Sequence, residues 1–335
     1  MSTFRVPVVK LGKIGKHPNA DSLSITTVEG CPCIFRTGDF NEGDLAVYIP
    51  VDAVVPEHVP GTEFLGSKRR IRAVRLRGIF SMGILLPISI LGPFAHEDHK
   101  YGGTDVAGHL GITKYEEPEP VFMQTDAAAP PPTNTQPPVY DMESYRKYKH
   151  LLVPEEPIVV TEKIHGTNSR FVFTGNELHV GSHRGWKKMD DRNLWWKIAE
   201  KYDLKNKLCQ YPEYVFYGET YGQVQDLKYG LKSNEFAVFD IYDSVNGKYL
   251  DWHIVFAICK FLCLPTVPVL YCGFFDPVRI ETLCDGNTLV NDTPQIREGI
   301  VIKPTQERWN NETGRTIFKL VSEDYLLRKG GTEHH

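Results

Sequence analysis

A stretch dense in proline near the middle of the chain constrains the fold most strongly. Seven of the 23 prolines fall between Pro118 and Pro138, in the string EEPEPVFMQTDAAAPPPTNTQPP. Because proline fixes φ and lacks a backbone N–H, this stretch favours neither a helix nor a central strand and predicts an extended linker. The sequence therefore predicts two domains, over residues 1–115 and 140–330, joined by a Pro-rich linker over residues 116–139.

The composition indicates the compartment of the protein and limits its binding partners. No run in its 335 residues reaches the roughly 18–20 apolar residues of a membrane span, so we expect no membrane partner. The seven cysteines form no CxxC pair and the N-terminal residues lack a signal peptide, so we expect an intracellular protein, cytoplasmic or nuclear. We also expect a monomer. With a net charge of −4, any nucleic-acid surface must be a local patch.

The first domain is predicted to be a small β-barrel. Its short segments alternate or run apolar, and turn signals such as His17-Pro-Asn-Ala-Asp21 and Asn41-Glu-Gly-Asp44 separate them. Strands are expected over residues 4–14, 23–28, 33–36, 45–49, 71–76 and 84–88. Five or six short strands in about 90 residues favour a closed barrel over an open sheet.

The second domain is predicted to be α+β. Strands are expected over residues 158–162, 170–174, 177–180, 214–217, 236–241, 300–303 and 316–320, and helices over residues 191–201 and 251–262. Strands dominate without a regular alternation of strand and helix, which indicates antiparallel sheets.

The most informative string is Thr161-Glu-Lys-Ile-His-Gly-Thr-Asn168. A strand of β-branched residues ends there, Lys163 follows, and Gly166 lets the chain turn sharply, so we expect Lys163 at the mouth of a cleft. A lysine attacks a phosphate only as the free amine, so burial or a divalent metal must lower its pKa from the usual value of about 10.4. Alone, the string also fits an ordinary surface lysine before a turn.

Five downstream strings change that interpretation. They are Ser182-His-Arg184, Tyr217-Gly-Glu219-Thr-Tyr221, Phe236-Ala-Val-Phe-Asp-Ile241, Arg297-Glu-Gly-Ile-Val-Ile-Lys303 and Phe318-Lys-Leu-Val-Ser322. In this order after the lysine string, they resemble the collinear motifs of covalent nucleotidyltransferases, the superfamily of RNA ligases, DNA ligases and mRNA capping enzymes. The first domain, with KHPNADSLSITTVEG, FNEGDLAVYIPVDAVVP and RLRGIFSMGILLP, resembles the OB-type barrel of tRNA-binding modules. The whole arrangement resembles the Deinococcus–Naegleria type of RNA ligase.

The resemblance implies a fold and a reaction. The fold would be α+β, with an N-terminal OB-fold β-barrel followed by an antiparallel-sheet nucleotidyltransferase domain of the ATP-grasp-like ligase kind. The reaction would be ATP-dependent RNA ligation, in which Lys163 takes AMP and passes it to an RNA 5′-phosphate before a 3′-hydroxyl attacks. The cofactors would be ATP and either Mg²⁺ or Mn²⁺, and the partner would be RNA with 5′-phosphate and 3′-hydroxyl ends.

The resemblance also implies roles for site residues. Glu219 would hold the ribose hydroxyl, Phe236 would stack on adenine, and Glu298 would position the metal. The remaining cofactor-site residues would be Glu162 at the adenine edge or as a support, Asn168, Arg184, and Lys303 and Lys319 at the α-phosphate. Ordinary structural roles fit as well, since Phe236 could be a core residue, Glu219 a turn carboxylate and Glu298 a surface ion pair.

Arginines supply the candidates for RNA phosphates. Arg184 lies 21 residues after Lys163, where the superfamily keeps a phosphate-binding arginine, and Arg146 and Arg192 are further candidates. Residues 68–77 carry six basic residues and no acid, and on a strand Arg70 and Arg72 would share one face toward a phosphate backbone. Aromatic residues are not interleaved with them, so base stacking is not expected, and a charged solvent face is the alternative.

Two positions depart from the superfamily's commonest motifs. His165 stands where an aspartate is commonest, which changes the surroundings of a metal, and Val321 stands where a second phosphate-binding lysine is frequent.

Two other functions also fit the sequence. A GTP-dependent capping guanylyltransferase or a DNA ligase is one alternative, although capping enzymes and many DNA ligases place the OB domain second. A non-catalytic RNA- or tRNA-binding protein is the other, and there Lys163→Ala would leave RNA binding intact.

Overall fold

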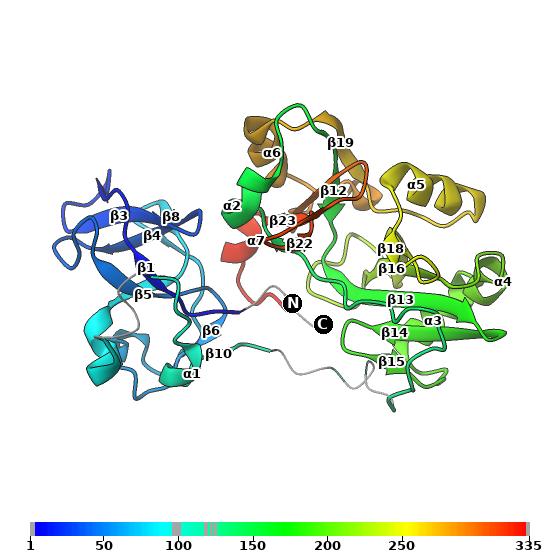
Figure 1. Cartoon of the computed structure of the whole chain (residues 1–335), viewed down its shortest axis with the longest axis horizontal. Helices are drawn as coiled ribbons and strands as arrows, with labels where there is room; N and C mark the ends of the chain where they lie inside the picture. The colour runs from blue at the N-terminus through cyan, green and yellow to red at the C-terminus, as the bar shows by residue number, and fades with distance from the viewer. Residues whose placement is uncertain (1–3, 96–101, 117–119, 121–122, 124–125, 333–335) are drawn as a thin grey trace. The chain divides into compact units, whose positions relative to one another are not determined.

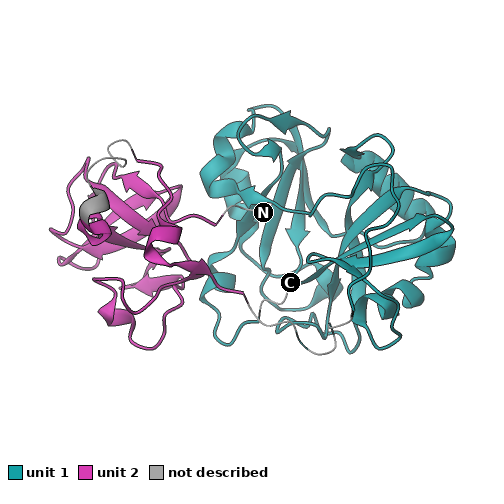
Figure 2. Cartoon of the chain, turned by 60° about the horizontal axis from the view of Figure 1, so that its bottom comes forward, with its two compact units in different colours: residues 1, 117–335 teal, residues 2–116 magenta. Residues whose placement is uncertain are grey.

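The computed structural model describes residues 4–95, 102–116, 120, 123 and 126–332, and the chain divides into two compact units. Residues 2–116 form one unit and residues 117–335 belong to the other, as the two colours of Figure 2 show. Each unit has a hydrophobic core of its own. The two are therefore described separately.

The first unit is built from short antiparallel strands. One sheet has the order β1-β5-β9, a second has the order β2-β3-β4, and two further strand pairs accompany them. The strands are β1 (Val8–Lys10), β2 (Gly15–Lys16), β3 (Leu23–Val28), β4 (Cys31–Arg36), β5 (Leu45–Ile49), β6 (Ala53–Val54), β7 (Val74–Leu76), β8 (Ile79–Ser81), β9 (Ile84–Pro87) and β10 (Thr113–Lys114). The short helices are η1 (Glu63–Leu65), η2 (Ile88–Ala95) and α1 (Ala107–Leu110). Apolar side chains from these elements, including Val8, Val47 and Ile49, form the core of the unit.

The second unit contains two larger sheets, both visible in Figure 1. The six-stranded sheet has the order β15-β14-β13-β16-β17-β18, and the five-stranded sheet has the order β11-β23-β20-β12-β19. The first consists of β13 (Gly166–Thr174), β14 (Glu177–Ser182), β15 (Trp186–Lys187), β16 (Tyr214–Tyr221), β17 (Glu235–Asp243) and β18 (Lys248–Tyr249). The second consists of β11 (Glu143–Ser144), β12 (Pro157–Lys163), β19 (Val269–Phe274), β20 (Gly299–Pro304) and β23 (Phe318–Val321). Neighbouring strands are antiparallel except for the parallel pair β11–β23.

Helices of this unit begin at side chains that cap them. Asn193 accepts hydrogen bonds from the backbone at the start of α3 (Leu194–Lys201), so this helix starts three residues later than predicted. Asp276 does the same for α6 (Pro277–Cys284), a helix that was not predicted although its Asp-Pro start is visible in the sequence. The other elements are α2 (Tyr145–Tyr148), η4 (Lys149–Leu151), α4 (Leu204–Leu208), α5 (Trp252–Phe261), η5 (Val290–Asp292), α7 (Glu323–Leu327) and the hairpin β21 (Trp309–Asn310)–β22 (Gly314–Arg315). None of the helices in the described ranges has the length and apolar character needed to cross a bilayer.

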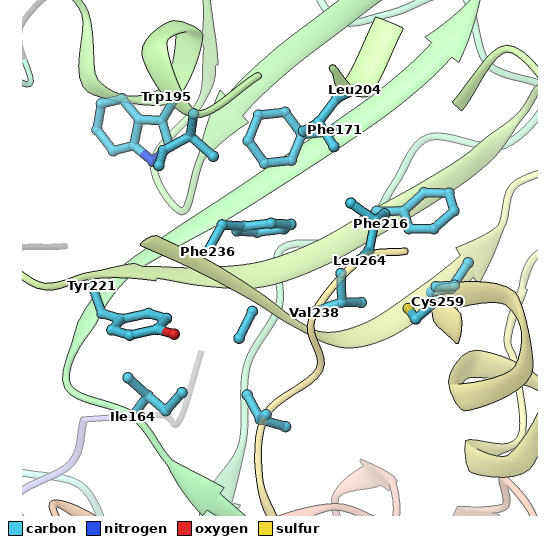
Figure 3. Packing of buried hydrophobic residues seen from close by; sticks show 14 of the residues in the cluster. Ile164, Phe171, Trp195, Leu204, Phe216, Tyr221, Phe236, Val238, Cys259 and Leu264 are labelled. Atoms are coloured by element: carbon cyan, nitrogen blue, oxygen red, sulfur yellow. The ribbon is translucent and has the colours of Figure 1, made fainter. Parts of the chain in front are cut away.

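The main core lies on one face of the six-stranded sheet. Helices α3 and α4 contact β13 and β14 there, and α5 contacts β17. Figure 3 shows the rings of Phe171, Phe216 and Phe236 gathered with Trp195 and Leu204 in this layer. The opposite face of the sheet is therefore the one left for other contacts.

Residues 126–139 of the Pro-rich stretch pack along the six-stranded sheet. The backbone N–H of Ala128 donates to the Trp186 carbonyl at 3.0 Å, and the Thr135 hydroxyl donates to the Ser244 carbonyl at 2.6 Å. The hydroxyl of Tyr217 donates to the Pro138 carbonyl at 2.6 Å. This stretch has no helix, but the sheet supplies polar partners that a free linker would take from water.

Candidate active site

Lys163 is the last residue of β12, and strand pairing decides which side chains share its face. Lys163 lies opposite Gly299 of β20 and Thr161 lies opposite Val301, which in turn lies opposite Lys319 of β23. Directly paired residues point to the same face of a sheet. Lys163, Val301 and Lys319 therefore share one face of the five-stranded sheet, and all three are half-buried.

Two carboxyl groups lie close to the Lys163 amine. Nζ donates to Glu298 Oε1 at 2.5 Å, with 22% of the lysine side chain and 8% of the glutamate exposed. Glu219 interacts with this pair from β16 of the other sheet, where it lies opposite Asn168. Burial raises the pKa of Glu219 to about 8, with repulsion from Glu298 adding to burial and attraction to Lys163 opposing it. The site thus combines the Lys163 amine with the Glu298 carboxyl group to which it donates and with a second carboxyl group, Glu219, whose pKa is raised.

Two buried oxygen atoms at this site are suited to a divalent cation. Within the described ranges, Glu298 Oε2 and Asn168 Oδ1 have no hydrogen-bond partner. An unsatisfied buried acceptor costs about 1–3 kcal/mol, so these atoms mark a place for a ligand. Carboxylate and amide oxygens are the ligands that Mg²⁺ and Mn²⁺ prefer. No group of three His, Cys, Asp or Glu side chains able to hold a metal occurs among the residues described.

Glu162 lies next to Lys163 in sequence but on the other face of the strand. Its side chain is fully buried, and it accepts hydrogen bonds from the Thr288 hydroxyl and from the Leu289 backbone N–H at 2.8 Å. Arg297 Nε is 3.9 Å away. Glu162 therefore supports the loop before β20, and its two oxygens are already satisfied by that loop.

Lys303 is on the Lys163 face but is engaged in a buried ion network. Its Nζ donates to Asp240 Oδ1 at 2.7 Å and to Glu307 at 3.1 Å, and only 4% of its side chain is exposed. Since Asp240 belongs to β17, the contact with Lys303 joins the five-stranded sheet to the six-stranded one, and Arg315 of the β21–β22 hairpin also donates to Asp240, at 2.7 Å. The structure thus places Lys303 in the contact between the sheets, whereas Lys319 is half-buried and lies opposite Val301.

Phe236 lies on the wrong face of β17 to stack on a base held by Glu219. It is opposite Thr220, whereas Glu219 is opposite Ala237, so the side chains of Phe236 and Glu219 point to different faces of the sheet. Phe236 is fully buried, with its ring 5.2 Å from that of Phe171. The assignment of Phe236 to adenine is therefore corrected, because alternation along the strand directs this ring into the core.

Phe239 is the aromatic residue of the same strand that faces the site. It lies two positions beyond Ala237 and so on the Glu219 face, at a point where the register between β16 and β17 shifts. Its ring is half-buried, 4.6 Å from the ring of Tyr140. The string Phe236-Ala-Val-Phe239 contains both candidates, but only the strand register distinguishes them.

The three arginines of the second unit that were expected at RNA phosphates differ in exposure and in partners. Arg184 is exposed in the turn between β14 and β15, where its backbone N–H donates to the Ser182 hydroxyl at 3.2 Å. Arg146 is half-buried on α2, a helix that contacts β23. Arg192 is 90% exposed and paired with Asp190 at 3.1 Å. The structure thus places Arg192 in a solvated turn before α3.

The two arginines predicted as RNA contacts in the first unit have different surroundings. Arg70 pairs with Asp52 at 2.6 Å, and its guanidinium lies 3.9 Å from the centre of the Tyr115 ring. Arg72 is exposed, just before the β7–β8 hairpin. Only Arg72 is thus directed to solvent, because Arg70 is used inside the unit.

Three residues that the sequence patterns do not mark hold the turn after Lys163. The hydroxyl of Tyr229 accepts from the backbone N–H of His165 at 2.6 Å, and Asp226 Oδ1 lies 2.8 Å from His165 Nε2. Gln225 donates to the Gly166 carbonyl at 2.7 Å. All three belong to the loop after β16, and no local periodicity points to them because their partners lie about 60 residues earlier in the chain.

Comparison with known proteins gives an assignment for each unit. Residues 156–321 match the family model described as RNA ligase. This part of the chain belongs to the RNA ligase family. Residues 5–88 match a model described as an OB-fold domain, so the predicted α+β fold with an N-terminal OB-fold domain and a nucleotidyltransferase-type ligase domain is confirmed.

Solved structures extend the likeness over nearly the whole chain. An alanine variant of Naegleria gruberi RNA ligase with ATP and Mn is 24% identical, with a TM-score of 0.85 over 97% of this chain and 98% of that one. The same ligase with pyrophosphate is 24% identical, with a TM-score of 0.83 over 96% and 97% of the two chains. Another alanine variant, with AMP and Mn, is 24% identical, with a TM-score of 0.84 over 96% and 98%. No match was found among curated proteins.

The raised pKa of Glu219 predicts how stability depends on pH. Between pH 4.5 and about 8 the folded state keeps the Glu219 proton that the unfolded state loses, so stability falls as the pH rises through this range. Glu219→Gln removes this contribution because the amide does not ionise. In EDTA, we expect raising the pH from 5 to 9 to lower the Tm of the wild type by about 3–6 °C more than that of the variant. If Tm fell equally with pH in the two proteins, the raised pKa of Glu219 would be contradicted.

Proposed function

We propose that this protein is an ATP-dependent RNA ligase that seals 5′-phosphate and 3′-hydroxyl ends through a covalent lysyl-AMP and an RNA-adenylate. The observation that carries the proposal is the position of Lys163 at the end of β12, paired with Glu298 at 2.5 Å inside the RNA ligase domain. The likeness to a ligase with ATP or AMP and Mn supports the choice of nucleotide and metal.

The chemistry follows from the contacts of Lys163. The amine must lose a proton before it attacks the α-phosphorus of ATP, and Glu298 Oε1 lies within hydrogen-bond distance to accept it. The new P–N bond forms as the bond to the pyrophosphate oxygen breaks. An RNA 5′-phosphate then displaces the lysine from AMP, and a 3′-hydroxyl displaces AMP to form the phosphodiester. Lys319, on the same face as Lys163, is the lysine proposed to neutralise the α-phosphate.

Glu298 and Asn168 are the residues proposed to hold the divalent cation. Each contributes a buried oxygen atom without a hydrogen-bond partner in the described part of the chain. When bound, Mg²⁺ or Mn²⁺ neutralises phosphate charge at the reacting centre. Glu219, with its carboxyl group protonated, can both donate to and accept from a ribose hydroxyl.

We expect Phe239, rather than Phe236, to contact the adenine ring. Base–aromatic stacking is worth about 1–3 kcal/mol, so Phe239→Leu should weaken ATP binding about 10-fold without a large loss of stability. Phe236→Leu should instead lower the Tm, because it opens a cavity beside Phe171, and should change ATP affinity less than about 2-fold. Titration calorimetry and thermal melts measure the two effects. If Phe236→Leu weakened ATP binding and Phe239→Leu did not, the adenine contact would be Phe236.

The exposed Arg72 of the OB-fold domain is proposed to contact the RNA backbone, and Arg184 and Arg146 the 5′-phosphate. Neutralising one phosphate contact lowers the slope of log affinity against log salt by about 1. We therefore expect Arg72→Ala to weaken RNA binding equally for different sequences and to reduce that slope by about 1. The matched control is Arg36→Ala, another exposed arginine of this domain, at the end of β4. Equal effects of the two variants would point to a diffuse charge effect.

Incubation with labelled nucleotide tests the function as a whole. The protein is incubated with [α-³²P]ATP or [α-³²P]GTP and a divalent cation, and then with nicked RNA that carries a 5′-phosphate. We expect label on the denatured protein from ATP alone and a sealed RNA strand afterwards. Label from GTP alone would favour a capping guanylyltransferase, sealing of DNA alone would favour a DNA ligase, and no label would favour a non-catalytic RNA-binding protein.

A further inference from the structure

The turn that follows Lys163 carries the chain from one sheet to the other. β12 ends at Lys163 in the five-stranded sheet, and β13 begins at Gly166 in the six-stranded sheet. A side chain at Gly166 would lie 2.2 Å from the Thr220 carbonyl oxygen, so this turn has no spare room. The direction of the Lys163 amine therefore depends on how Ile164 and His165 are held.

His165 is held at its backbone and at both ring nitrogens. Its backbone N–H donates to the Tyr229 hydroxyl, Nε2 lies 2.8 Å from Asp226 Oδ1, and Nδ1 lies 2.9 Å from the hydroxyl of Tyr325. Because an ionised carboxylate only accepts, Nε2 carries a proton. Only 4% of the side chain is exposed, so the ring has little freedom to turn.

The last part of the chain holds these partners of His165. Tyr325 is in α7, and Arg328 Nε donates to Asp226 Oδ2 at 2.9 Å. The backbone N–H of Thr332 donates to Asp226 Oδ1 at 2.9 Å, and its hydroxyl donates to Gln225 at 2.8 Å. Residues 325–332, here named the C-terminal clasp, thus reach the turn directly through Tyr325 and indirectly through Asp226 and Gln225.

Charge strengthens the clasp. Asp226 lies between the ring of His165 and the guanidinium of Arg328, and such charge-assisted hydrogen bonds are about twice as strong as neutral ones. The Arg328 guanidinium also lies 3.5 Å from the centre of the Tyr325 ring. Burial raises the pKa of Asp226, but hydrogen bonds from His165 and Arg328 outweigh burial and hold it well below its usual range. Asp226 is therefore a carboxylate at neutral pH.

We propose that the C-terminal clasp positions the Lys163 amine for transfer of AMP, with Tyr325, Asp226 and Arg328 as positioning residues. The proposal rests on the proposed ligase function, because it concerns the step in which Lys163 attacks ATP. A misplacement of about 1 Å between reacting groups can cost about 100-fold in rate. Sealing of RNA that is already adenylated does not use Lys163 as a nucleophile. Loss of the clasp therefore slows transfer of AMP to the protein and spares that sealing step.

A point substitution and a shortened chain test the clasp. Tyr325→Phe removes one hydroxyl and keeps the ring, and a chain ending at Leu327 removes Arg328 and Thr332. We expect single-turnover formation of lysyl-AMP at saturating ATP to slow about 10-fold and about 100-fold respectively. Sealing of preadenylated nicked RNA should stay within about 2-fold of the wild type. The controls are Tyr214→Phe, at a half-buried tyrosine of β16, and a chain ending at Thr332, both expected to match the wild type.

The result that overturns the inference is equally specific. Unchanged adenylation in both variants, or an equal fall in adenylation and in sealing of preadenylated RNA, would show that the clasp serves folding only. If the shortened chain does not fold, Tyr325→Phe alone decides. This variant is expected to have a Tm close to that of the wild type, so a change in the ratio of its adenylation rate to its sealing rate does not come from unfolding. A wild-type protein that forms no lysyl-AMP would overturn the proposed function itself, which separates that failure from a failure of the clasp.

Discussion

Lys163→Ala is expected to abolish the transfer of AMP from ATP to the protein, with a loss of at least about 1000-fold. The variant lacks the amine that forms the P–N bond, and the nearest carboxylate, Glu298, cannot replace it as a nitrogen nucleophile. Mass spectrometry after incubation with ATP and Mn²⁺ measures the effect directly. The wild-type protein should gain the mass of one AMP on the peptide that contains Lys163, and the variant should gain none.

The control for this prediction is Lys188→Ala, at an exposed lysine paired with Asp126. This variant should be adenylated at the wild-type rate. Lys163→Ala should still seal preadenylated RNA, since that step needs no nucleophile from the protein. AMP found on another residue of Lys163→Ala would contradict the assignment of the nucleophile.

Glu298→Gln is expected to lower both adenylation and sealing of preadenylated RNA by about 100- to 1000-fold. The amide keeps the shape of the side chain but loses the charge that pairs with Lys163 and the Oε2 acceptor proposed for the divalent cation. Both steps should fall because each needs phosphate charge to be neutralised. Rates measured against Mn²⁺ concentration should show a higher half-saturating concentration for the variant.

The matched control here is Glu281→Gln, at an exposed glutamate that pairs with Lys149. Surface pairs of this kind contribute about 0–1 kcal/mol, so both rates should be unchanged. A Glu298→Gln protein with an unaltered Mn²⁺ dependence would remove Glu298 from the metal site and leave it only as the partner of Lys163.

The predicted site and the structure agree best where the pattern is local. Lys163 ends a strand of β-branched residues, and Glu298 lies directly before another strand, so the one-dimensional pattern already indicated where each stands. Strand pairing then brings the two together, with Lys163 opposite Gly299. The pairing itself was not readable from the sequence, because the partners are 135 residues apart.

The predictions that needed revision concern the direction of side chains. Phe236 and Phe239 are both aromatic residues of one strand, and alternation makes them face opposite ways, but only the register against β16 shows which faces Glu219. Lys303 is on the same face as Lys163, yet its amine donates to Asp240 of the other sheet. Neither fact is a property of a short string of residues.

By itself, the amino-acid sequence determined the α+β class with an N-terminal OB-fold domain and a ligase domain, and it predicted Lys163 as the nucleophile. Proline density, strand periodicity and an ordered set of short motifs are all written along the chain, so they can be read without a structure. Only the tertiary structure decided which aromatic ring lies on the Glu219 face of the sheet, that Asp240 binds Lys303, and that residues 325–332 hold the turn after Lys163. These depend on contacts such as Tyr325 with His165, 160 residues apart, that form only when the two sheets have packed.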